Sequence, residues 1–381
     1  MLMKTRLFSP SILALCLLGL PVVSQAEITL LKQDPQATDP LSRLNVKVGG
    51  SIRPQFNHQT GGKDKSYKRN GFDGGTRFRF SVDYALTQDI NWVNYYEVGV
   101  NIPKVFNWDN HYASGATNTT RRQWFTGLKS QQYGQLTFGQ QNSVYYDAVG
   151  AKTDIWDDDM LAQAPGNGVN GDYDGSYRSR KMLKYKGRVG DFDVYASYLF
   201  GDDPLLTSDK MRYKRKGGGS VGIDYHITKD LSWGTAWNYT KATVYDHAHG
   251  QSKDYNQNIV GTSLGWTPGN WTIAAGGGYY QNFLKTKLKN ANNYFAGDAW
   301  GVEYFAGYKF PVQQMGVKAV MPYVMGDRLE YVNGRNYKRI DNGVGVALFA
   351  YYGFRVDYEH VFASTTDKEG DMNLVRFRYD F

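Results

Sequence analysis

The sequence predicts an all-β protein, a transmembrane antiparallel β-barrel of about 16 strands with one long loop folded into its lumen. Three observations support this prediction. Apolar and polar side chains alternate through one segment after another, and the connectors between these segments are alternately short and long. Aromatic residues make up 15% of the chain although its mean hydropathy is only −0.54. A barrel in a bilayer needs such strands, because one face of each strand meets lipid and the other meets water.

The first 26 residues read as a cleaved signal peptide that is not part of the fold. Lys4 and Arg6 form a basic start, residues 12–23 are mostly apolar, and residues 24–26 offer small side chains at a cleavage site. This organisation is typical of secretory signals, and the apolar run is shorter than the roughly 20 residues of a membrane-spanning helix. We therefore expect a mature chain of residues 27–381 that forms a single barrel domain.

Cysteine usage and charge exclude several classes of function. The one cysteine, Cys16, lies in the signal segment, where the bulky Leu15 before it argues against lipoprotein processing. The mature chain therefore has no thiol catalysis, iron–sulfur cluster or cysteine-bound zinc, and we expect no cofactor. Loss of Lys4 and Arg6 lowers the net charge from +8 to +6. These charges are spread along the chain rather than clustered, so we expect no nucleic acid partner.

The strands are predicted from a period of two. In residues 77–84, Phe78, Phe80 and Val82 lie on one face, while Arg77 and Arg79 lie on the other. A soluble β-sandwich shows the same alternation, so a single segment does not distinguish it from a barrel. The pattern repeats in residues 95–102, 191–198, 220–227 and 375–381, and we count about sixteen such segments of the length that a tilted membrane strand needs.

The connectors distinguish the two architectures. Tight turns are expected at 189–191, 228–230 and 267–270, and long polar connectors at 58–74, 103–118, 204–216 and 246–255. Short and long connectors follow one another, which places the long ones on one rim of a barrel. A sandwich has no reason to sort its loops in this way. Lipid offers no partner for the backbone, so the sheet has to close without an edge.

One connector is much longer and acidic, and we expect it, at about residues 143–175, to fold into the lumen. It contains one lysine, Lys152, and a set of aspartates: Asp147, Asp154, Asp157, Asp158, Asp159, Asp172 and Asp174. Most loops rich in Asp and Gly are solvated surface loops, and this is the competing interpretation. A loop that folds into the lumen would instead set the narrowest point of a pore.

The segments around this loop resemble the general, non-specific trimeric porins of Gram-negative bacterial outer membranes. The run at 122–129 resembles their fourth strand, and residues 134–139, 143–147 and 153–154 are similar to their approach to an infolded third loop. The terminal Phe381, with Tyr379 before it, also fits the family. At the loop tip the chain differs: residues 156–160 read Trp-Asp-Asp-Asp-Met where the family has Pro-Glu-Phe-Gly-Gly-Asp.

The resemblance implies a pore constriction in which wall arginines face loop acids. By position it assigns the following residues to the constriction: Arg77, Arg122 and Arg178 on the wall, Glu97 in the lumen, Tyr146 at the loop base, and Asp154 with Asp157 or Asp158 on the loop. Arg180 has the same parity as Arg178 and is the alternative to it. The resemblance further implies a homotrimer in outer-membrane lipid, with the connector at 103–118 reaching a neighbouring subunit.

The function expected from these residues is passive diffusion of small hydrophilic solutes and ions through a water-filled channel. An alternative is a channel selective for oligosaccharides or another solute class, with Trp124 and Trp156 as an aromatic track for sugar rings. We expect no enzyme, because an outer-membrane hydrolase needs a histidine paired with acids or serine at one rim. His247 and His249 lie together at a predicted loop tip, without further metal ligands at convincing spacing.

Overall fold

The computed structural model describes residues 27–60, 72–106, 118–156, 162–163, 168–208, 211–284, 291, 294–295, 297–334 and 336–381. The predicted signal peptide, Asp157 and Asp158 lie outside these residues. In chain order the elements are β1 (Glu27–Leu31), η1 (Leu41–Arg43), β2 (Leu44–Ile52), β3 (Pro54–Thr60), β4 (Phe72–Asp73), β5 (Arg77–Ala85), β6 (Ile90–Val100), α1 (Ile102–Phe106), β7 (Thr119–Ser130), β8 (Gly134–Asn142), α3 (Val144–Ala148), η2 (Gly150–Lys152), α4 (Gly171–Asp174), β9 (Arg178–Val189), β10 (Phe192–Leu199), β11 (Leu205–Ser208), β12 (Met211–His226), β13 (Leu231–Asp246), β14 (Gln251–Trp266), β15 (Trp271–Gln281), β16 (Ala299–Tyr308), β17 (Phe310–Gln314), β18 (Val317–Tyr331), β19 (Lys338–Ala350), η4 (Tyr351–Gly353), β20 (Phe354–Thr365) and β21 (Asp371–Asp380).

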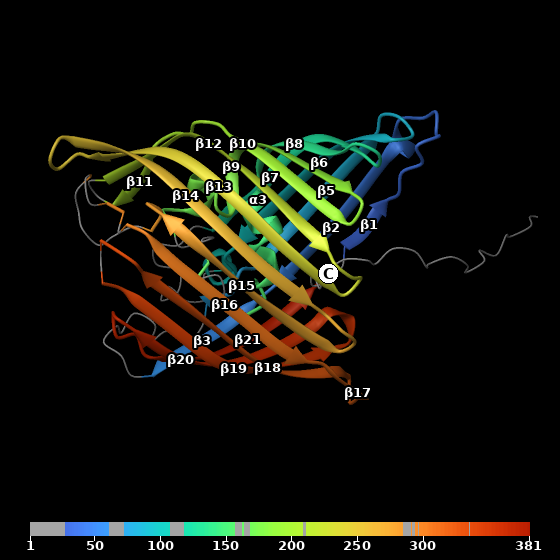
Figure 1. Cartoon of the computed structure of the whole chain (residues 1–381). Helices are drawn as coiled ribbons and strands as arrows, with labels where there is room; N and C mark the ends of the chain where they lie inside the picture. The colour runs from blue at the N-terminus through green and yellow to red at the C-terminus, as the bar shows by residue number, and fades with distance from the viewer. Residues whose placement is uncertain are drawn as a thin grey trace, which may run out of the picture.

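The strands form one closed antiparallel barrel (Figure 1). Over the described residues its wall has sixteen strands, which confirms the predicted fold class. β2 and β3 together make the first wall strand, β21 is the last, and the short β1, β4, β11 and β17 add to the wall strands. Alternation explains the wall: in β14 the exposed Val260 and Leu264 point outward, while the buried Ile259 and Ser263 point inward.

The barrel closes where its two ends meet. β2 pairs with β5 on one side and with β21 on the other, and β3 continues along β21. Gly50 donates its N–H to the carbonyl oxygen of Phe381 at 2.7 Å and accepts the Phe381 N–H at 3.1 Å. The next residue of β2, Gly49, pairs with Glu27 of β1. β1 therefore continues the line of β21 past the last residue, so that both ends of the described chain share one strand position.

The predicted tight turns are confirmed, and two predicted long connectors are wrong. Residues 190–191, 227–230 and 267–270 are short links at one end of the barrel. At the other end β13 and β14 are joined by only four residues, 247–250, and β12 already begins at Met211. The sequence at 204–216 and 246–255 looked like loops because its outward side chains are polar. Residues 211–216 and 251–255 instead extend β12 and β14 beyond the apolar zone of the wall.

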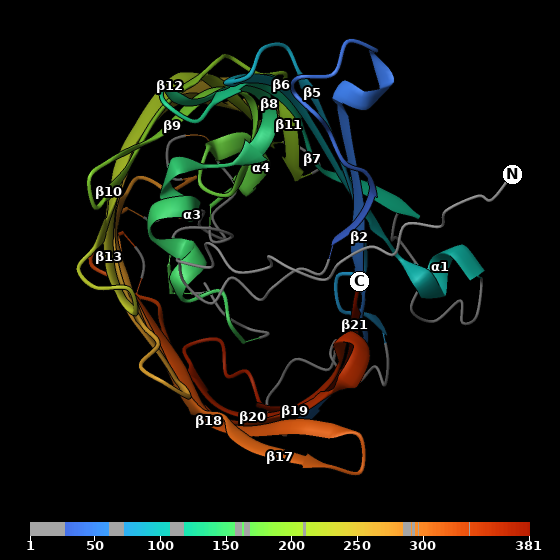
Figure 2. The ribbon, with the colours of Figure 1, turned by 90° about the vertical axis from the view of Figure 1, so that its right-hand side faces the viewer.

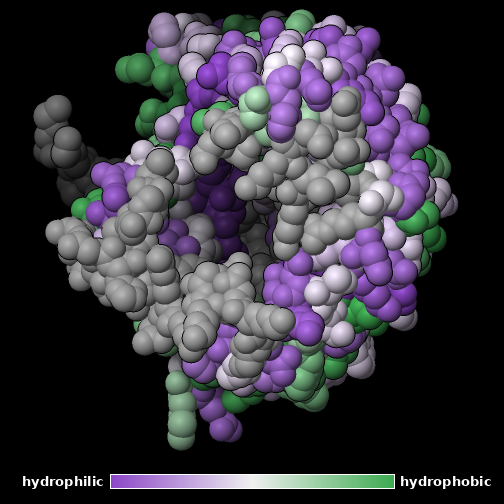
Figure 3. Space-filling model, turned by 90° about the vertical axis from the view of Figure 1, so that its left-hand side faces the viewer, coloured by the Kyte–Doolittle hydropathy of each residue, from purple (hydrophilic) through white to green (hydrophobic). Residues whose placement is uncertain are grey.

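The connector between β8 and β9 lies inside the barrel, where Figure 2 shows α3 and α4 enclosed by the wall. α1 projects outside the ring beside β2 and β21 in the same view. Figure 3 shows the opposite mouth, where hydrophilic residues surround a deep hollow. In the described part of the chain no helix is long and apolar enough to span a membrane.

Candidate functional site

The infolded loop, which we define as residues 143–177, packs against one half of the barrel wall. Ser143 caps α3 by accepting the N–H of Tyr146 at 3.0 Å. The short helix buries Val144, Tyr145 and Ala148 in a cluster with Ala236 of β13 and Ile259 of β14. Burial of these side chains holds the base of the loop on the wall by the hydrophobic effect.

Wall glycines allow the loop backbone to approach closely. A Cβ on Gly234 of β13 would lie 1.8 Å from the carbonyl oxygen of Ala148, and one on Gly301 of β16 would lie 1.5 Å from that of Ala162. Neither position can carry a larger residue unless the loop moves. The glycines of these strands therefore fit the wall to the loop.

Buried polar contacts fix the loop in addition. Lys152 forms a 2.8 Å ion pair with Asp224 of β12, with side chains that are 0% and 3% exposed. Its Nζ also donates to the Ala148 carbonyl oxygen at 2.9 Å. Glu303 of β16 accepts the Thr153 hydroxyl at 3.0 Å and the Ala162 N–H at 3.1 Å. These fastenings lie on β12 and β16, and Asp147 of the loop also pairs with Lys184 of β9 at 2.7 Å. The other half of the wall makes none of these contacts.

That other half carries arginines. Glu97 of β6 accepts Nε of Arg79 at 2.8 Å and Nε of Arg122 at 2.5 Å, so one carboxylate lies between two guanidinium groups. The hydroxyl of Tyr95 donates to the same carboxylate at 3.3 Å. This group of three side chains keeps one net positive charge, because the single carboxylate of Glu97 pairs with two guanidinium groups.

Arg77 lies next to this group. It is paired across the strands with Gly99, and the side chain of Arg122 extends over Gly99, 3.3 Å from where a Cβ would be. Arg77 donates Nε to the Gly75 carbonyl oxygen at 2.9 Å. Within the described residues it pairs with no carboxylate. The wall thus presents Arg77 and Arg122 side by side.

Arg178 and a loop acid meet at a cavity of about 460 Å³. Its lining includes Arg122 and Arg178 on the wall and Asp172 on the loop. Arg178 lies over the Tyr177 ring at 4.2 Å and reaches Asp172 at 3.8 Å. Asp172 was not among the acids that we predicted for the constriction, although it stands in the acidic run of the sequence.

The loop carboxyl groups have altered proton affinities. Burial raises the pKa of Asp172, against the opposing effect of Arg178 and Arg122. Burial also raises the pKa of Asp174 to about 6, although Ser176 donates both its hydroxyl and its N–H to this carboxylate. Burial lowers the pKa of Lys152, and Asp224 opposes that shift.

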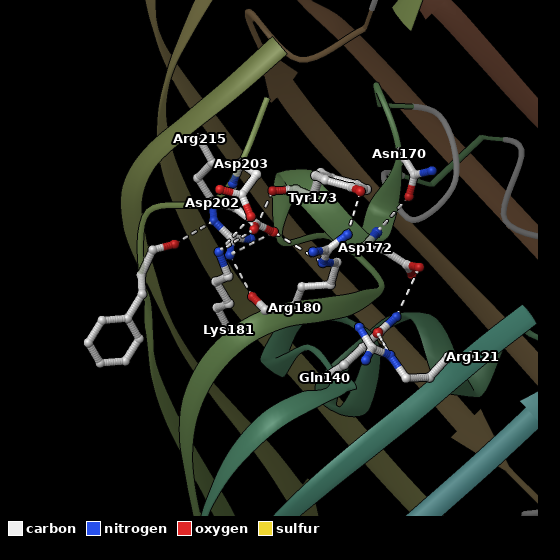
Figure 4. A network of polar contacts seen from close by, with 11 residues as sticks. Arg121, Gln140, Asn170, Asp172, Tyr173, Arg180, Lys181, Asp202, Asp203 and Arg215 are labelled. Carbon is white, nitrogen blue, oxygen red and sulfur yellow. Dashed lines mark hydrogen bonds and ion pairs between the residues drawn. The ribbon is translucent and has the colours of Figure 1, made fainter. Parts of the chain in front are cut away.

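Arg180, the alternative to Arg178, belongs to a different network, which Figure 4 shows from close by. It forms a 3.2 Å ion pair with Asp202 and lies over the Tyr173 ring at 4.5 Å. The buried Arg215 donates to the carbonyl oxygens of Tyr173 and Arg180 at 2.8 and 2.5 Å. These contacts tie the end of the loop to β9 and β12. Arg178, and not Arg180, lines the cavity.

The remaining predicted residues lie as follows. Tyr146 donates its hydroxyl to Asp154 within the loop. Asp157 and Asp158 are outside the described residues. The proposed aromatic track is wrong in both members: Trp124 is 59% exposed on the outer face of β7, and Trp156 is 3% exposed in a cluster with Phe305 and Met325.

Sequence reasoning missed a second group of arginines, which lie along the seam where the barrel closes. Arg355 of β20 stands directly opposite Arg378 of β21, and like charges in that position repel each other. Asp357 pairs with Arg355 at 2.6 Å, and Asp380 pairs with Arg378 at 2.7 Å. Arg53, between β2 and β3, donates to the Ser51 hydroxyl at 2.7 Å and pairs with no carboxylate in the described chain. Arg53 lies two residues after Ser51, which pairs with Arg77 across the strands, so alternation places Arg53 and Arg77 on the same face. This alternation was the sequence signal that could have identified Arg53.

The histidines at the tip between β13 and β14 do not assemble a metal site. His249 interacts through Nδ1 with Asp246 at 2.7 Å. In the described parts of the chain no three His, Cys, Asp or Glu side chains converge as metal ligands would.

Comparisons with known proteins agree with this architecture. The family model described as Gram-negative porin matches residues 13–380. OmpF of Salmonella typhi, solved with daunomycin, is similar over 89% of this chain and 98% of its own, with a TM-score of 0.66 at 14% identity. A trimer form of OmpT, an outer membrane protein of Vibrio cholerae, is similar over 89% and 99%, with a TM-score of 0.59 at 14% identity. An anion-selective porin from Comamonas acidovorans is similar over 89% and 100%, with a TM-score of 0.59 at 16% identity.

Proposed function

The chain belongs to the Gram-negative porin family, and we propose that it forms a channel for passive diffusion of small hydrophilic solutes and ions through an arginine and aspartate constriction. As a porin it is an outer-membrane channel protein. The observation that carries the finer proposal is the cavity lined by Arg122 and Arg178 from the wall and by Asp172 from the loop.

The mechanism is an electrostatic filter. Guanidinium groups remain charged at every physiological pH. The arginines lie on β5, β7 and β9, and the middle of the loop is fastened to β12 and β16, so we propose that acids in the middle of the loop face the arginines across the water. Asp172, near the end of the loop, lies 3.8 Å from Arg178 on the arginine side. The resulting transverse field orients dipolar solutes and separates the paths of anions and cations. Diffusion needs no conformational step.

We propose Arg77, Arg122 and Arg178 as the wall of the constriction, with Glu97 positioning Arg122. Asp172 is the acid on the loop side, and Asp154, Asp157 and Asp158 remain proposed on the strength of the family resemblance. Tyr146 holds Asp154 by its hydroxyl hydrogen bond.

We further propose that the mature protein begins at Glu27 and assembles as a homotrimer. The small residues at 24–26 after the apolar run at 12–23 support cleavage after Ala26. α1 projects from the wall beside β2, and its exposed Val105 and Phe106 suit a contact with a second subunit.

Planar bilayers test the function. The refolded mature protein should give large ohmic conductance steps in groups of three, with modest ion selectivity and no block by oligosaccharides. Concentration-dependent block by one class of sugar would replace diffusion with a selective channel. Folded barrels without conductance would overturn the open passage, and single steps would overturn the trimer. Mass spectrometry of the purified protein checks the cleavage after Ala26.

A further inference from the structure

A second cavity, which we call the turn-side recess, lies on the inner face of β7, β8 and β9. It has a volume of about 190 Å³ and shares no lining residue with the cavity at Arg122 and Arg178. The residues of its lining that matter here are Gln123, Phe125, Gln135, Asp147, Lys184 and Lys186. The recess begins at Gln123, the neighbour of Arg122, and reaches Gln135, close to the short turn at 131–133. It therefore lies between the arginines and the turn end of the barrel.

The recess is open because one inward position of β7 has no side chain. Phe125, Gly127 and Lys129 are the inward residues of this part of the strand. A Cβ at Gly127 would lie 2.1 Å from the carbonyl oxygen of Leu136, so the position accepts only glycine unless the strands move. The ring of Phe125 is stacked on that of Tyr95, with centroids 5.2 Å apart, and borders the space that remains.

The charges in the recess do not cancel. Lys184 pairs with Asp147 at 2.7 Å, so these two charges compensate each other. Lys186 is exposed and forms no ion pair with any described residue, and its Nζ lies 5.3 Å from the centroid of the Tyr195 ring. Gln135 stands opposite Lys186 across the strands, and its amide makes no hydrogen bond to the described part of the chain. One uncompensated cation and one available amide thus lie side by side.

We propose that the turn-side recess binds small aromatic monocarboxylates such as benzoate. The carboxylate accepts hydrogen bonds from Nζ of Lys186 and from the side-chain amide of Gln135, and the ring packs against Phe125. A single uncompensated cation matches a single carboxylate. Phosphates are instead favoured by the forked donors of arginine, and none of the described lining residues of the recess is an arginine.

The role of the recess rests on the proposed diffusion channel and adds a binding step to it. The arginines of the constriction act on the charge of an anion, and anions of equal charge are alike to them. The recess acts on the ring as well as on the charge. A carboxylate that has passed the arginines is therefore held longer on the turn side when it carries a flat apolar body.

Fluorine NMR of 4-fluorobenzoate with the detergent-purified mature protein tests the recess without any need for conduction. Exchange broadening of the fluorine signal gives the dissociation constant. Lys186→Gln removes a charge-assisted hydrogen bond and should weaken binding about tenfold. Phe125→Leu keeps an apolar side chain but removes the ring, and should weaken binding about threefold.

Lys129→Gln is the matched control. Lys129 is exposed, stands opposite Gln135 on the side away from Lys186, and does not line the recess. The control removes the same charge and should bind the probe as the parent protein does. Equal losses in Lys129→Gln and Lys186→Gln would overturn the site, as would displacement of the probe by acetate as readily as by benzoate. Loss in Arg178→Gln with no change in Lys186→Gln would overturn it too, since the probe would then lie at the constriction.

Planar bilayers separate this proposal from the channel itself. Benzoate added on the turn side should interrupt the open current briefly, and Lys186→Gln should shorten these interruptions. Conductance steps without any binding of the probe would overturn the recess and leave the channel standing. Probe binding that depends on Lys186 in barrels that do not conduct would overturn the channel and support the recess. Heat-modifiable gel mobility verifies that each variant is folded.

Discussion

Replacement of Lys152 by Met should loosen the infolded loop and make the channel current noisy. Lys152 lies on the loop and Asp224 on β12, and the pair is buried from both sides. Without the ammonium group, Asp224 keeps a negative charge that only the fastened loop buries. Opening the loop would return this carboxylate to water, so the substitution stabilises the open state of the loop relative to the fastened state.

The expected size follows from the burial. Removal of one partner of a buried ion pair costs about 3–5 kcal/mol, since the other charge is left without compensation. A tenfold change in an equilibrium constant corresponds to about 1.4 kcal/mol. The population of released loop should therefore rise by roughly 10²–10³-fold. The second variant, Lys152→Met with Asp224→Asn, removes both charges and should recover most of the loss.

Two readouts follow the loop. Proteinase K added to the reconstituted protein measures how often the loop is accessible, and single-channel recordings measure fluctuations of the open current. Lys229→Met, an exposed lysine in the turn after β12, serves as the control and should leave both unchanged. If Lys152→Met matched the control in cleavage rate and current noise, the ion pair would not be a fastening of the loop and the reasoning would fail.

Three further predictions concern selectivity, packing and pH. Arg53→Gln with Arg77→Gln should reduce the anion-to-cation permeability ratio by roughly thirtyfold in a salt-gradient reversal potential at low ionic strength, since each charge about 8 Å from the path acts with roughly 0.5 kcal/mol in water and with opposite sign on anions and cations. An unchanged potential would remove both from the conduction path. Gly301→Val should push the loop away from the wall at Ala162 and change the conductance, whereas an unchanged conductance would contradict the close approach. Because burial raises the pKa of Asp174 to about 6 from its usual 3.8, the folded loop holds a proton more tightly than the unfolded one, and its stability should fall as the pH rises from about 4 to above 6. Because burial also raises the pKa of Asp172, Asp174→Asn should weaken this dependence in hydrogen exchange of the loop without removing it, and a dependence of unchanged size would assign it to other groups.

The wall could be predicted from the sequence because the alternation of apolar and polar residues identifies the outward and the inward face of each strand. Phe78, Phe80 and Val82 against Arg77 and Arg79 suffice for β5, and the same rule gives the neighbouring strands. The rule failed at the outer ends of β12 to β14. There the outward side chains are charged instead of apolar, because the strands rise above the hydrocarbon zone. A strand with polar residues on both faces has no sequence pattern that distinguishes it from a loop.

Of the residues proposed for the constriction, the sequence could guide the choice only on the wall. Arg77 follows the alternation of β5, whereas Arg122 is the extra residue of a bulge in β7, which turns its side chain to the face of Glu97. Alternation alone would have placed Arg122 on the outer face with Trp124. The loop has no such rule, because its course depends on contacts with distant strands: Glu303 binds the loop at Ala162, 141 residues away in sequence. Asp172 lines the cavity because of the path that the loop takes, and no local sequence pattern predicts that position. The same reason explains why Trp156 points into a buried cluster rather than toward the passage.

The junction of the two chain ends has a consequence for the order of assembly. On the side away from β5, Gly50 pairs with Phe381 and Gly49 pairs with Glu27. Contacts of this sequence separation carry a large loop-closure cost and form late. The barrel therefore stays an open, curled sheet until β21 can pair with β2 and β3. A product truncated before β21 leaves the edges of β20 and of β2 with β3 unpaired and cannot close in this way, so it cannot become a leaky pore in the membrane.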